Sequence, residues 1–407
     1  MLTQFSVTNF RSIKNTVTLD MQATAINEHQ EHLIKGADGR LYLPVASIYG
    51  PNGSGKSNIV YAMEYLMFLI RNPIESVSNV NGSQKIFQKL SPFAFSEETR
   101  NGPSEFTVYY LTEIAEYRYE IHILGQEIIY ESLSQRKNST HRESRLFERN
   151  QNITTVFNDL QKMKISEDIS SRIPLLSYMF ITYGKNKLIS DAINGFSKSL
   201  YAIRYRSTPF SYVYQIYEKE EKLRKLVLEM IQEMDIDVVD LKIYDSTEGK
   251  VFAVHKLKDE VFELNIFDES NGTQKLFELL LFIATNLSIG GTLIIDEIDA
   301  NIHPALLKHI IQWHTDSSVN QKGAQLIFTS HDLANMNNDT FRRDEIWFVA
   351  KGNQQDSVLY SLVEFIMENG AKVRNDARYD KQYLEGKYGA DPYLQKMINW
   401  EEFNERN

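Results

Sequence analysis

Two short motifs about 240 residues apart constrain the fold of this chain more than any other feature. Residues 50–57 read GPNGSGKS and fit the pattern G-x-x-x-x-G-K-[ST], a loop whose backbone N–H groups surround phosphate oxygens. Residues 292–297 read TLIIDE, an apolar segment that ends in two acids. The pair predicts one phosphate site in which the acids manage a magnesium ion and an attacking water.

The sequence on both sides of residues 50–57 supplies the context that such a loop needs. The apolar run Leu43–Tyr49 predicts a strand, and Asn58–Ile70 has apolar residues at helical spacing. The loop glycines allow the backbone to approach a ligand closely. The alternative interpretation is a glycine-rich turn without a function. The residues predicted to bind the nucleotide are Asn52, Gly53, Ser54, Gly55, Lys56, Ser57 and Asn58, with Lys56 on the β- and γ-phosphates and Ser57 on Mg²⁺.

Asp296 and Glu297 follow Leu293–Ile295, a run typical of a central strand that is buried on both faces. In a phosphoryl-transfer site the first acid holds the metal and the second polarises the attacking water. The alternative is that both acids only end a strand and cap the helix that begins at Pro304. We predict Asp296 as a metal ligand beside Ser57, and Glu297 as a catalytic residue.

Two further segments carry candidate site residues. Residues 269–274 open a predicted helix, where exposed N–H groups and a serine hydroxyl can bind an anion. A plain helix cap by Ser270 or Asn271 is the alternative. His331 follows the predicted strand 325–328, at the edge where ligands gather in open α/β sheets. A neutral imidazole there could sense the γ-phosphate or orient the water, and a structural histidine is the alternative.

The composition narrows the class of protein. The chain has 407 residues, a net charge of −10 and no cysteine, which fits a globular protein of a reducing compartment. Because no signal-peptide core and no membrane-length apolar run is present, we expect a cytoplasmic protein without a membrane partner. The acidic surface as a whole does not attract nucleic acid. One basic stretch predicts either a solvated hairpin loop or a local basic face: Arg136, Lys137, Arg142, Arg145 and Arg149.

The hydrophobic pattern predicts an α/β fold, with a mixed sheet, flanking helices and an inserted β-rich and helical lobe. Residues 1–159 contain the phosphate loop and the β-rich part. Residues 160–238 are expected to form a helical insertion that serves as a lid or docking surface. Residues 239–407 contain the acid-tipped strand and end in a strand at 345–350 and a polar tail.

These motifs together resemble one family, the ABC-type ATPases that include RecF and SMC proteins. Residues 9–13, NFRSI, are similar to the opening of such proteins, and the resemblance implies that Arg11 contacts the nucleotide. The two motifs described first correspond to Walker A and Walker B. Residues 299–304 resemble the D-loop of OLD-like ATPases, with Asp299 coupling the two sites, and His331 matches the switch histidine. The short ABC signature is matched by Ser270, Asn271, Gly272, Thr273 and Gln274.

Narrower similarities point to the stand-alone RloA-like, abortive-infection ATPases of bacterial anti-phage defence. They lie in residues 103–106, 344–349 and 383–390, the last with Lys387 where arginine is common. About 76 residues follow His331, too few for the Toprim nuclease domain of OLD proteins. The resemblance therefore implies an ATPase without its own nuclease, similar to the ATPase of PARIS-type systems.

The resemblance implies a head-to-tail homodimer that closes around ATP and Mg²⁺, with the signature of one subunit on the Walker A loop of the other. We expect an ATP-hydrolysing switch that controls a separate effector, a Toprim-like nuclease or toxin, after a phage protein or DNA acts as trigger. The alternative is a RecF-like or SMC-like DNA maintenance ATPase that binds DNA directly. The glutamine loop has two candidates, Gln84 and Gln88.

Overall fold

The computed structural model describes most of the chain, in ten stretches. Gln84 and Gln88, the candidates for the glutamine loop, and Asn301 of the predicted D-loop lie outside them. In these stretches no helix is both long and apolar enough to cross a membrane. The described residues are 1–73, 90–166, 169–203, 210–234, 236–245, 248, 250–258, 260–300, 302–367 and 370–390.

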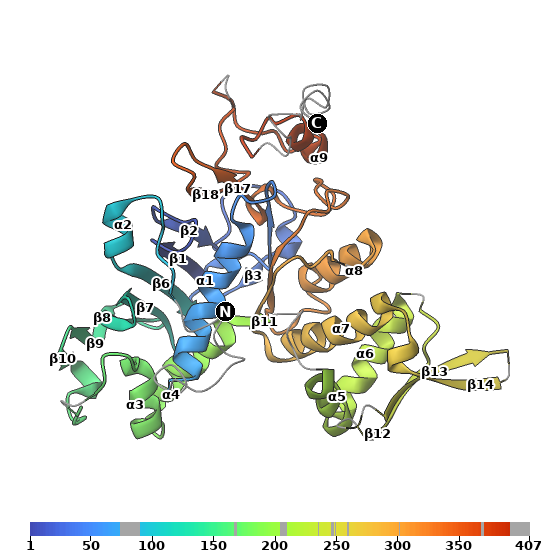
Figure 1. Cartoon of the computed structure of the whole chain (residues 1–407), viewed down its shortest axis with the longest axis horizontal. Coiled ribbons are helices and arrows are strands. Elements are labelled where there is room, and N and C mark those ends of the chain that lie inside the picture. The colour runs from blue at the N-terminus through green and yellow to red at the C-terminus, as the bar shows by residue number, and fades with distance from the viewer. Residues whose placement is uncertain are drawn as a thin grey trace, which may run out of the picture.

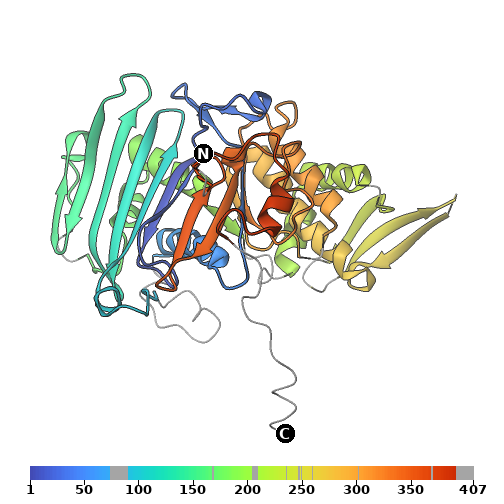
Figure 2. The ribbon, with the colours of Figure 1, turned by 90° about the horizontal axis from the view of Figure 1, so that it is seen from above.

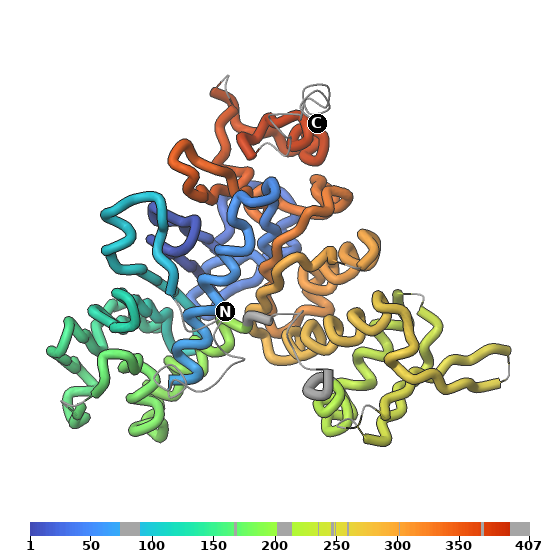
Figure 3. Tube along the Cα trace, viewed as in Figure 1, coloured from blue at the N-terminus to red at the C-terminus, as the bar shows by residue number. Residues whose placement is uncertain are grey.

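A six-stranded core sheet carries both motifs of the phosphate site. Its strands, in spatial order, are β11 (Tyr201–Ile203), β15 (Thr292–Ile295), β16 (Gln325–Thr329), β5 (Val45–Tyr49), β17 (Ile346–Lys351) and β18 (Ser357–Ser361). The first five run parallel and β18 is antiparallel. Segments from the two ends of the chain therefore lie side by side (Figure 3).

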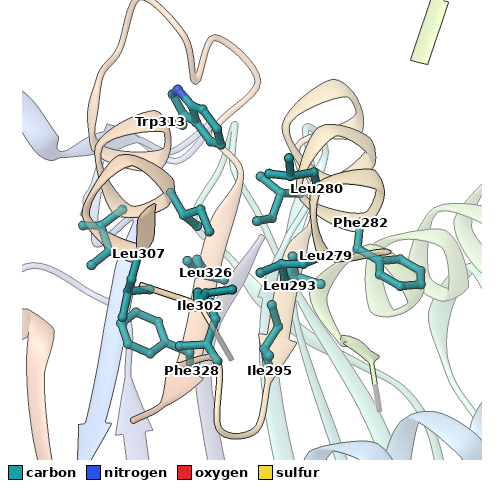
Figure 4. Close-up of a cluster of buried hydrophobic side chains, with 14 of the residues drawn as sticks. Leu279, Leu280, Phe282, Leu293, Ile295, Ile302, Leu307, Trp313, Leu326 and Phe328 are labelled. Atoms are coloured by element: carbon teal, nitrogen blue, oxygen red, sulfur yellow. The ribbon is translucent and has the colours of Figure 1, made fainter. Parts of the chain in front are cut away.

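The core sheet is apolar on both faces because helices cover both. Ile294 and Ile327 belong to the cluster of helix α1 (Lys56–Arg71), on one face. The opposite face packs against α7 (Asn271–Ile289) and α8 (Pro304–Thr315) (Figure 4). The buried side chains on that face include Leu279, Leu280, Leu293, Ile295, Leu307, Leu326 and Phe328. Such two-sided burial explains the uninterrupted apolar runs of these strands.

A seven-stranded antiparallel sheet forms one side of the molecule (Figures 1 and 2). Its order is β10 (Ile153–Val156), β9 (Glu143–Asn150), β8 (Glu127–Lys137), β7 (Ala115–Leu124), β6 (Ser104–Leu111), β1 (Leu2–Thr8) and β2 (Val17–Asp20). The short helix α2 (Glu97–Asn101) precedes β6. Residues 131–160, which look polar in the sequence, thus extend this sheet.

Most of the basic stretch in these strands is paired with acids. Arg136 lies 2.6 Å from Glu116, and Arg145 contacts Glu148 at 2.7 Å. Arg149 is buried, and its guanidinium donates to the carboxylate of Glu131 at 2.8 Å. The stretch thus lies mostly in strands β8 and β9 rather than in the expected solvated hairpin loop, and its pairing with acids speaks against a free basic face.

The expected helical range 160–238 is divided in the structure. Helices α3 (Leu175–Tyr183) and α4 (Lys187–Ser199) pack near α1 and β6, on the side of the seven-stranded sheet. Strand β11 then joins the core sheet beside β15. Helices α5 (Phe210–Lys219) and α6 (Glu221–Glu233) pack on α7 at the other side of the molecule. A three-residue strand such as β11 carries too little periodicity to be found in the sequence.

A three-stranded sheet next to α5 and α6 projects from this second side (Figures 1 and 2). It consists of β12 (Asp240–Asp245), β13 (Lys250–Leu257) and β14 (Glu260–Asn265). Strand β14 leads through a short 3₁₀ turn, Ile266–Asp268, directly into α7.

The remaining elements complete the core. A two-stranded sheet of β3 (Ile34–Lys35) and β4 (Leu41–Tyr42) precedes β5, and Gln30–His32 forms a 3₁₀ turn before it. The expected polar tail is structured in part, because β18 extends the core sheet and α9 (Tyr379–Leu384) follows. The ring of Phe348 lies 5.5 Å from that of Tyr383 and 5.3 Å from that of Tyr388, which anchors this region on β17.

Candidate functional site

The loop between β5 and α1 takes a backbone path that depends on its glycines. Gly50, Gly53 and Gly55 have positive φ angles of 153°, 75° and 105°. A Cβ atom on Gly50 would lie 2.3 Å from the carbonyl oxygen of Val349, and one on Gly55 would lie 2.1 Å from Ser357 Oγ. Any side chain at these two positions would therefore move the loop away from the sheet.

Lys56 begins α1 and turns back over the loop. Its ammonium group donates to the carbonyl oxygens of Gly50 at 2.7 Å and Pro51 at 3.3 Å. Burial lowers the pKa of Lys56, and the charges of three acids, Asp296, Glu297 and Asp299, oppose that shift. The lysine of one motif thus lies within electrostatic range of the acids of the other.

Thr329, at the end of β16, holds the two acids that follow β15. Its hydroxyl donates to Asp296 Oδ1 at 2.6 Å and accepts from the backbone N–H of Glu297 at 2.7 Å. Glu297 has a positive φ of 51°, a conformation that a side-chain-bearing residue seldom adopts. The neighbouring strand therefore fixes the direction in which both carboxylates leave the sheet.

Asp299 connects this edge to the segment after β16. Its Oδ2 atom accepts from the backbone N–H of His331 at 3.1 Å, whereas the His331 side chain is exposed. The charges of Asp332 and Asp299 add to burial in raising the pKa of Tyr49, the last residue of β5. The acids thus converge on the end of the phosphate-loop strand.

The polar atoms at this edge fit a triphosphate with a magnesium ion. Asp299 Oδ1 and Ser54 Oγ are buried without a hydrogen-bond partner in the described part of the chain. Buried polar atoms normally have partners, so these two atoms fit a polar ligand at this edge. Ser57 and Asp296 are the residues that would hold Mg²⁺, which prefers oxygen ligands, and Asn52 and Gly53 leave the loop open to solvent.

The N-terminal motif packs against the back of the same loop. Ser12 accepts a hydrogen bond from Asn58 Nδ2 at 2.7 Å and shares another, of 2.7 Å, with Ser357 Oγ. Ser357 Oγ in turn donates to the carbonyl oxygen of Ser54 at 2.5 Å. Three segments that are far apart in the sequence therefore fix the loop.

Arg11 lies on α1 rather than in the loop. Its guanidinium carbon is 4.6 Å from the ring centre of Tyr61, and its backbone has a positive φ of 52°. Asn9, two residues before Arg11, has a structural role. Its Oδ1 atom accepts from the backbone N–H of Phe93, and its Nδ2 atom donates to the carbonyl oxygen of Gly102. Contact of Arg11 with a nucleotide stays a prediction.

The residues that resemble the ABC signature lie at the start of α7. Ser270 is exposed and caps the helix, accepting from the backbone N–H of Thr273 at 3.1 Å. Gln274 Nε2 donates to the carbonyl oxygen of Glu269 at 2.8 Å. Across the stretches that the structure describes, no hydrogen bond or ion pair joins residues 270–274 to residues 50–57.

Two contributors to the site have no assigned role in the sequence analysis. Residues 329–332 read TSHD, so Thr329 lies two residues before His331. Its position at the end of a predicted strand is the signal that could have placed it in the site. Ser357 lies in a segment that reads as polar tail, and no sequence pattern connects it with Gly55. Both act through contacts between distant segments.

Comparison with known families agrees with this geometry. Residues 45–162 and 180–337, more than half of the chain, match the family model described as "AAA domain, putative AbiEii toxin, Type IV TA system". The chain belongs to this AAA family. The match spans the phosphate loop, the acid-tipped strand and His331, and the predicted α/β architecture of a phosphate-loop ATPase is confirmed.

The solved structures that the chain matches include heads of SMC proteins. The SMC head domain from Thermotoga maritima has 14% identity and a TM-score of 0.43, covering 88% of this chain and 98% of that one. An SMC head bound to the C-terminal domain of ScpA, derived from Pyrococcus furiosus, has 14% identity and a TM-score of 0.44, covering 88% and 96%. No curated protein matches the chain.

Proposed function

We propose that this chain is an ATP-binding and ATP-hydrolysing switch of a bacterial anti-phage defence system. It dimerises around ATP and controls a separate effector of the Toprim-like nuclease or toxin class. The observation that supports the proposal is that β5 and β15 run parallel on either side of β16, so Lys56, Asp296 and Glu297 follow strand ends at the same edge of the core sheet. The family description, which names a toxin of a toxin–antitoxin system, supports the defence role.

The roles of the residues follow from their positions. Lys56 and the N–H groups at the start of α1 bind phosphate oxygens. For this contact the ammonium group of Lys56 gives up its hydrogen bond to the carbonyl oxygen of Gly50. Bound Mg²⁺ would neutralise charge on the transferred phosphoryl group. Glu297 aligns the attacking water, and Thr329 keeps its backbone in place. His331 is held by Asp299 within reach of the same edge.

The exposed start of α7 supports a site that is completed by a second copy. Ser270 and the first N–H groups of α7 form an anion-binding surface without a partner segment in the described chain. In the head-to-tail dimer this surface contacts the γ-phosphate held by the other subunit. The closed state is then favoured while the γ-phosphate is present, and hydrolysis removes that preference.

The test of the chemistry is the variant Glu297→Gln, which keeps size and hydrogen bonding but removes the charge. We expect phosphate release to fall by about 10²–10⁴-fold with ATP affinity retained. ATP-bound Glu297→Gln should accumulate as a dimer in light scattering, and wild type should do so only transiently. Wild-type turnover by this variant would remove Glu297 from its role.

The DNA-clamp alternative is distinguished by a binding assay. The pairing of Arg136, Arg145 and Arg149 with acids leaves little free positive charge on that sheet. We therefore expect no DNA binding by ATP-bound Glu297→Gln. Binding that requires ATP and weakens steeply with salt would replace the effector switch by a clamp that acts on DNA directly.

A further inference from the structure

Three side chains that precede the core sheet lie together without a role in the nucleotide site. They are His29, Glu31 and His32, at the 3₁₀ turn before β3. Each offers one ligand atom, and the three atoms lie within 4.8 Å of one another. Two imidazoles and one carboxylate form a donor set typical of zinc and of related divalent transition metals.

The contacts of His29 place its Nδ1 atom against the carboxylate of Glu31. Nε2 lies 2.7 Å from the carbonyl oxygen of Asn338, which can only accept, so this nitrogen carries the proton. In the neutral ring, Nδ1 is then an acceptor, yet it lies 3.1 Å from another acceptor, Glu31 Oε1. Tetrahedral zinc places neighbouring ligand atoms about 3.3 Å apart, so an ion suits this pair of acceptors.

His32 faces a buried acid at a distance longer than a hydrogen bond. Its Nδ1 atom is buried without a hydrogen-bond partner and lies 3.6 Å from Glu345 Oε2. The Glu345 side chain is fully buried, and its second oxygen, Oε1, also lacks a partner in the described chain. A carboxylate behind one nitrogen of a histidine commonly orients the other nitrogen toward a metal.

We propose that His29, Glu31 and His32 bind one zinc-class divalent cation, through His29 Nδ1, Glu31 Oε1 and the Nε2 atom of His32. Asn338 holds the His29 ring from behind, and the carboxylate of Glu345 lies 3.6 Å behind the His32 ring. The rings are now stacked, with centroids 4.5 Å apart and planes at 11°, so their lone pairs run side by side. Closing on an ion requires rotation of the His32 ring, whose Nδ1 atom has no hydrogen bond to break within the described residues.

The site has an entry path and a mechanical consequence. A cavity of about 980 Å³ between α6, α7 and α8 is lined by Glu31 and His32, so an ion can reach them from solvent. The bound ion would connect the turn before β3 to the segment at Asn338 and, through Glu345, to the start of β17. The segment that contains Asn338 joins β16 to β17, and these two strands flank the phosphate-loop strand β5.

The same contact also suits a protonated His29 paired with Glu31. Burial lowers the pKa of His29, but its hydrogen bonds to Asn338 and Glu31 outweigh burial and raise the pKa above its ordinary value. The experiment must therefore separate a metal ion from an imidazolium–carboxylate pair.

The test uses the full chain without an affinity tag, stripped with a chelator and kept in excess Mg²⁺ without nucleotide. Zn²⁺ is titrated by calorimetry, and Co²⁺ is followed by its visible absorption. We expect one ion per chain in wild type and loss of that ion in the double variant His29→Ala with His32→Ala. The matched control is His309→Ala, because His309 on α8 lines the same cavity outside the cluster.

A second variant covers the case in which the double histidine variant fails to fold. Glu31 is 71% exposed, so Glu31→Gln preserves the core while it removes one charged ligand. We expect at least about tenfold weaker Zn²⁺ binding and loss of the Zn²⁺-dependent rise in Tm that wild type shows. No uptake by wild type, or equal uptake by wild type and Glu31→Gln, would overturn the proposal.

Discussion

The phosphate-loop edge and the start of α7 carry the two halves of the proposed ATP site, and they are built in opposite ways. The loop edge is connected across strands, because Thr329 holds Asp296 while Ser357 holds the loop itself. In the described residues the start of α7 has local hydrogen bonds, since the exposed Ser270 bonds Thr273 in its own turn and Gln274 bonds the preceding 3₁₀ turn. One half is braced by distant strands of the same chain, whereas the other presents an exposed serine at a helix N-terminus.

The largest expected effect on ATP hydrolysis comes from inactivating the phosphate loop in one chain and the start of α7 in another. Lys56→Ala should lose nucleotide binding, and Ser270→Arg should block the surface that meets the phosphate of the other subunit. Each variant alone is expected to be inactive. An equimolar mixture should recover about a quarter of wild-type phosphate release, because half of its dimers contain one intact composite site.

The matched control is Ser288→Arg, which adds the same side chain at the exposed opposite end of α7. It should hydrolyse ATP at the wild-type rate. Normal turnover by Ser270→Arg would show that the start of α7 lies outside the site.

A smaller effect is expected from loosening the braced half. Thr329→Val keeps the shape of the side chain, but Asp296 loses a donor and the Glu297 N–H loses its acceptor. Since partners behind metal ligands typically contribute 10–100-fold, we expect the Mg²⁺ concentration for half-maximal hydrolysis to rise about tenfold. Thr329→Ser retains the hydroxyl and should resemble wild type. An unchanged Mg²⁺ dependence in Thr329→Val would contradict the bracing role.

The smallest effect concerns the stability of the other half. Burial raises the pKa of Glu278 on α7 from 4.5 to about 7, with Lys275 opposing in part. The folded state therefore favours the protonated carboxyl, and this contribution to the free energy of unfolding, complete below pH 4.5, is lost as pH rises through about 7.

The variant Glu278→Gln should remove that dependence. Thermal unfolding of wild type is compared at about pH 5 and about pH 8, and the difference in Tm should shrink in the variant. Glu278 is half-buried, so the change is modest. An equal difference in both proteins would exclude Glu278 as its source.

The sequence predicts the loop edge better than it predicts its supports. Residues 50–57 and 292–297 have fixed local spacing, and their strand–loop–helix setting has a strong period, so both motifs and their strands were found. The role of the Ser357 hydroxyl depends instead on its contact with Ser54, about 300 residues away in the sequence. Such contacts leave no mark in a single sequence.

Contacts between distant segments also explain why the predictions for the basic stretch and for residues 160–238 were incomplete. Arg149 looks solvated in sequence, yet Glu131 neutralises it inside the sheet. The range 160–238 reads as one insertion, but β11 pairs with β15 and sends its helices to both sides of the molecule. Local polarity and helical period describe a segment well, and they do not say which distant segment it meets.

The place of β5 between β16 and β17 has a consequence for synthesis. On the ribosome, the strand that carries the phosphate loop emerges about 280 residues before the first of its two neighbours. Until then both of its edges are unpaired and its apolar faces lack α7 and α8, which favours off-pathway association and engagement by chaperones. Nucleotide-binding competence is therefore acquired late in translation, after the last strands of the core sheet have been made.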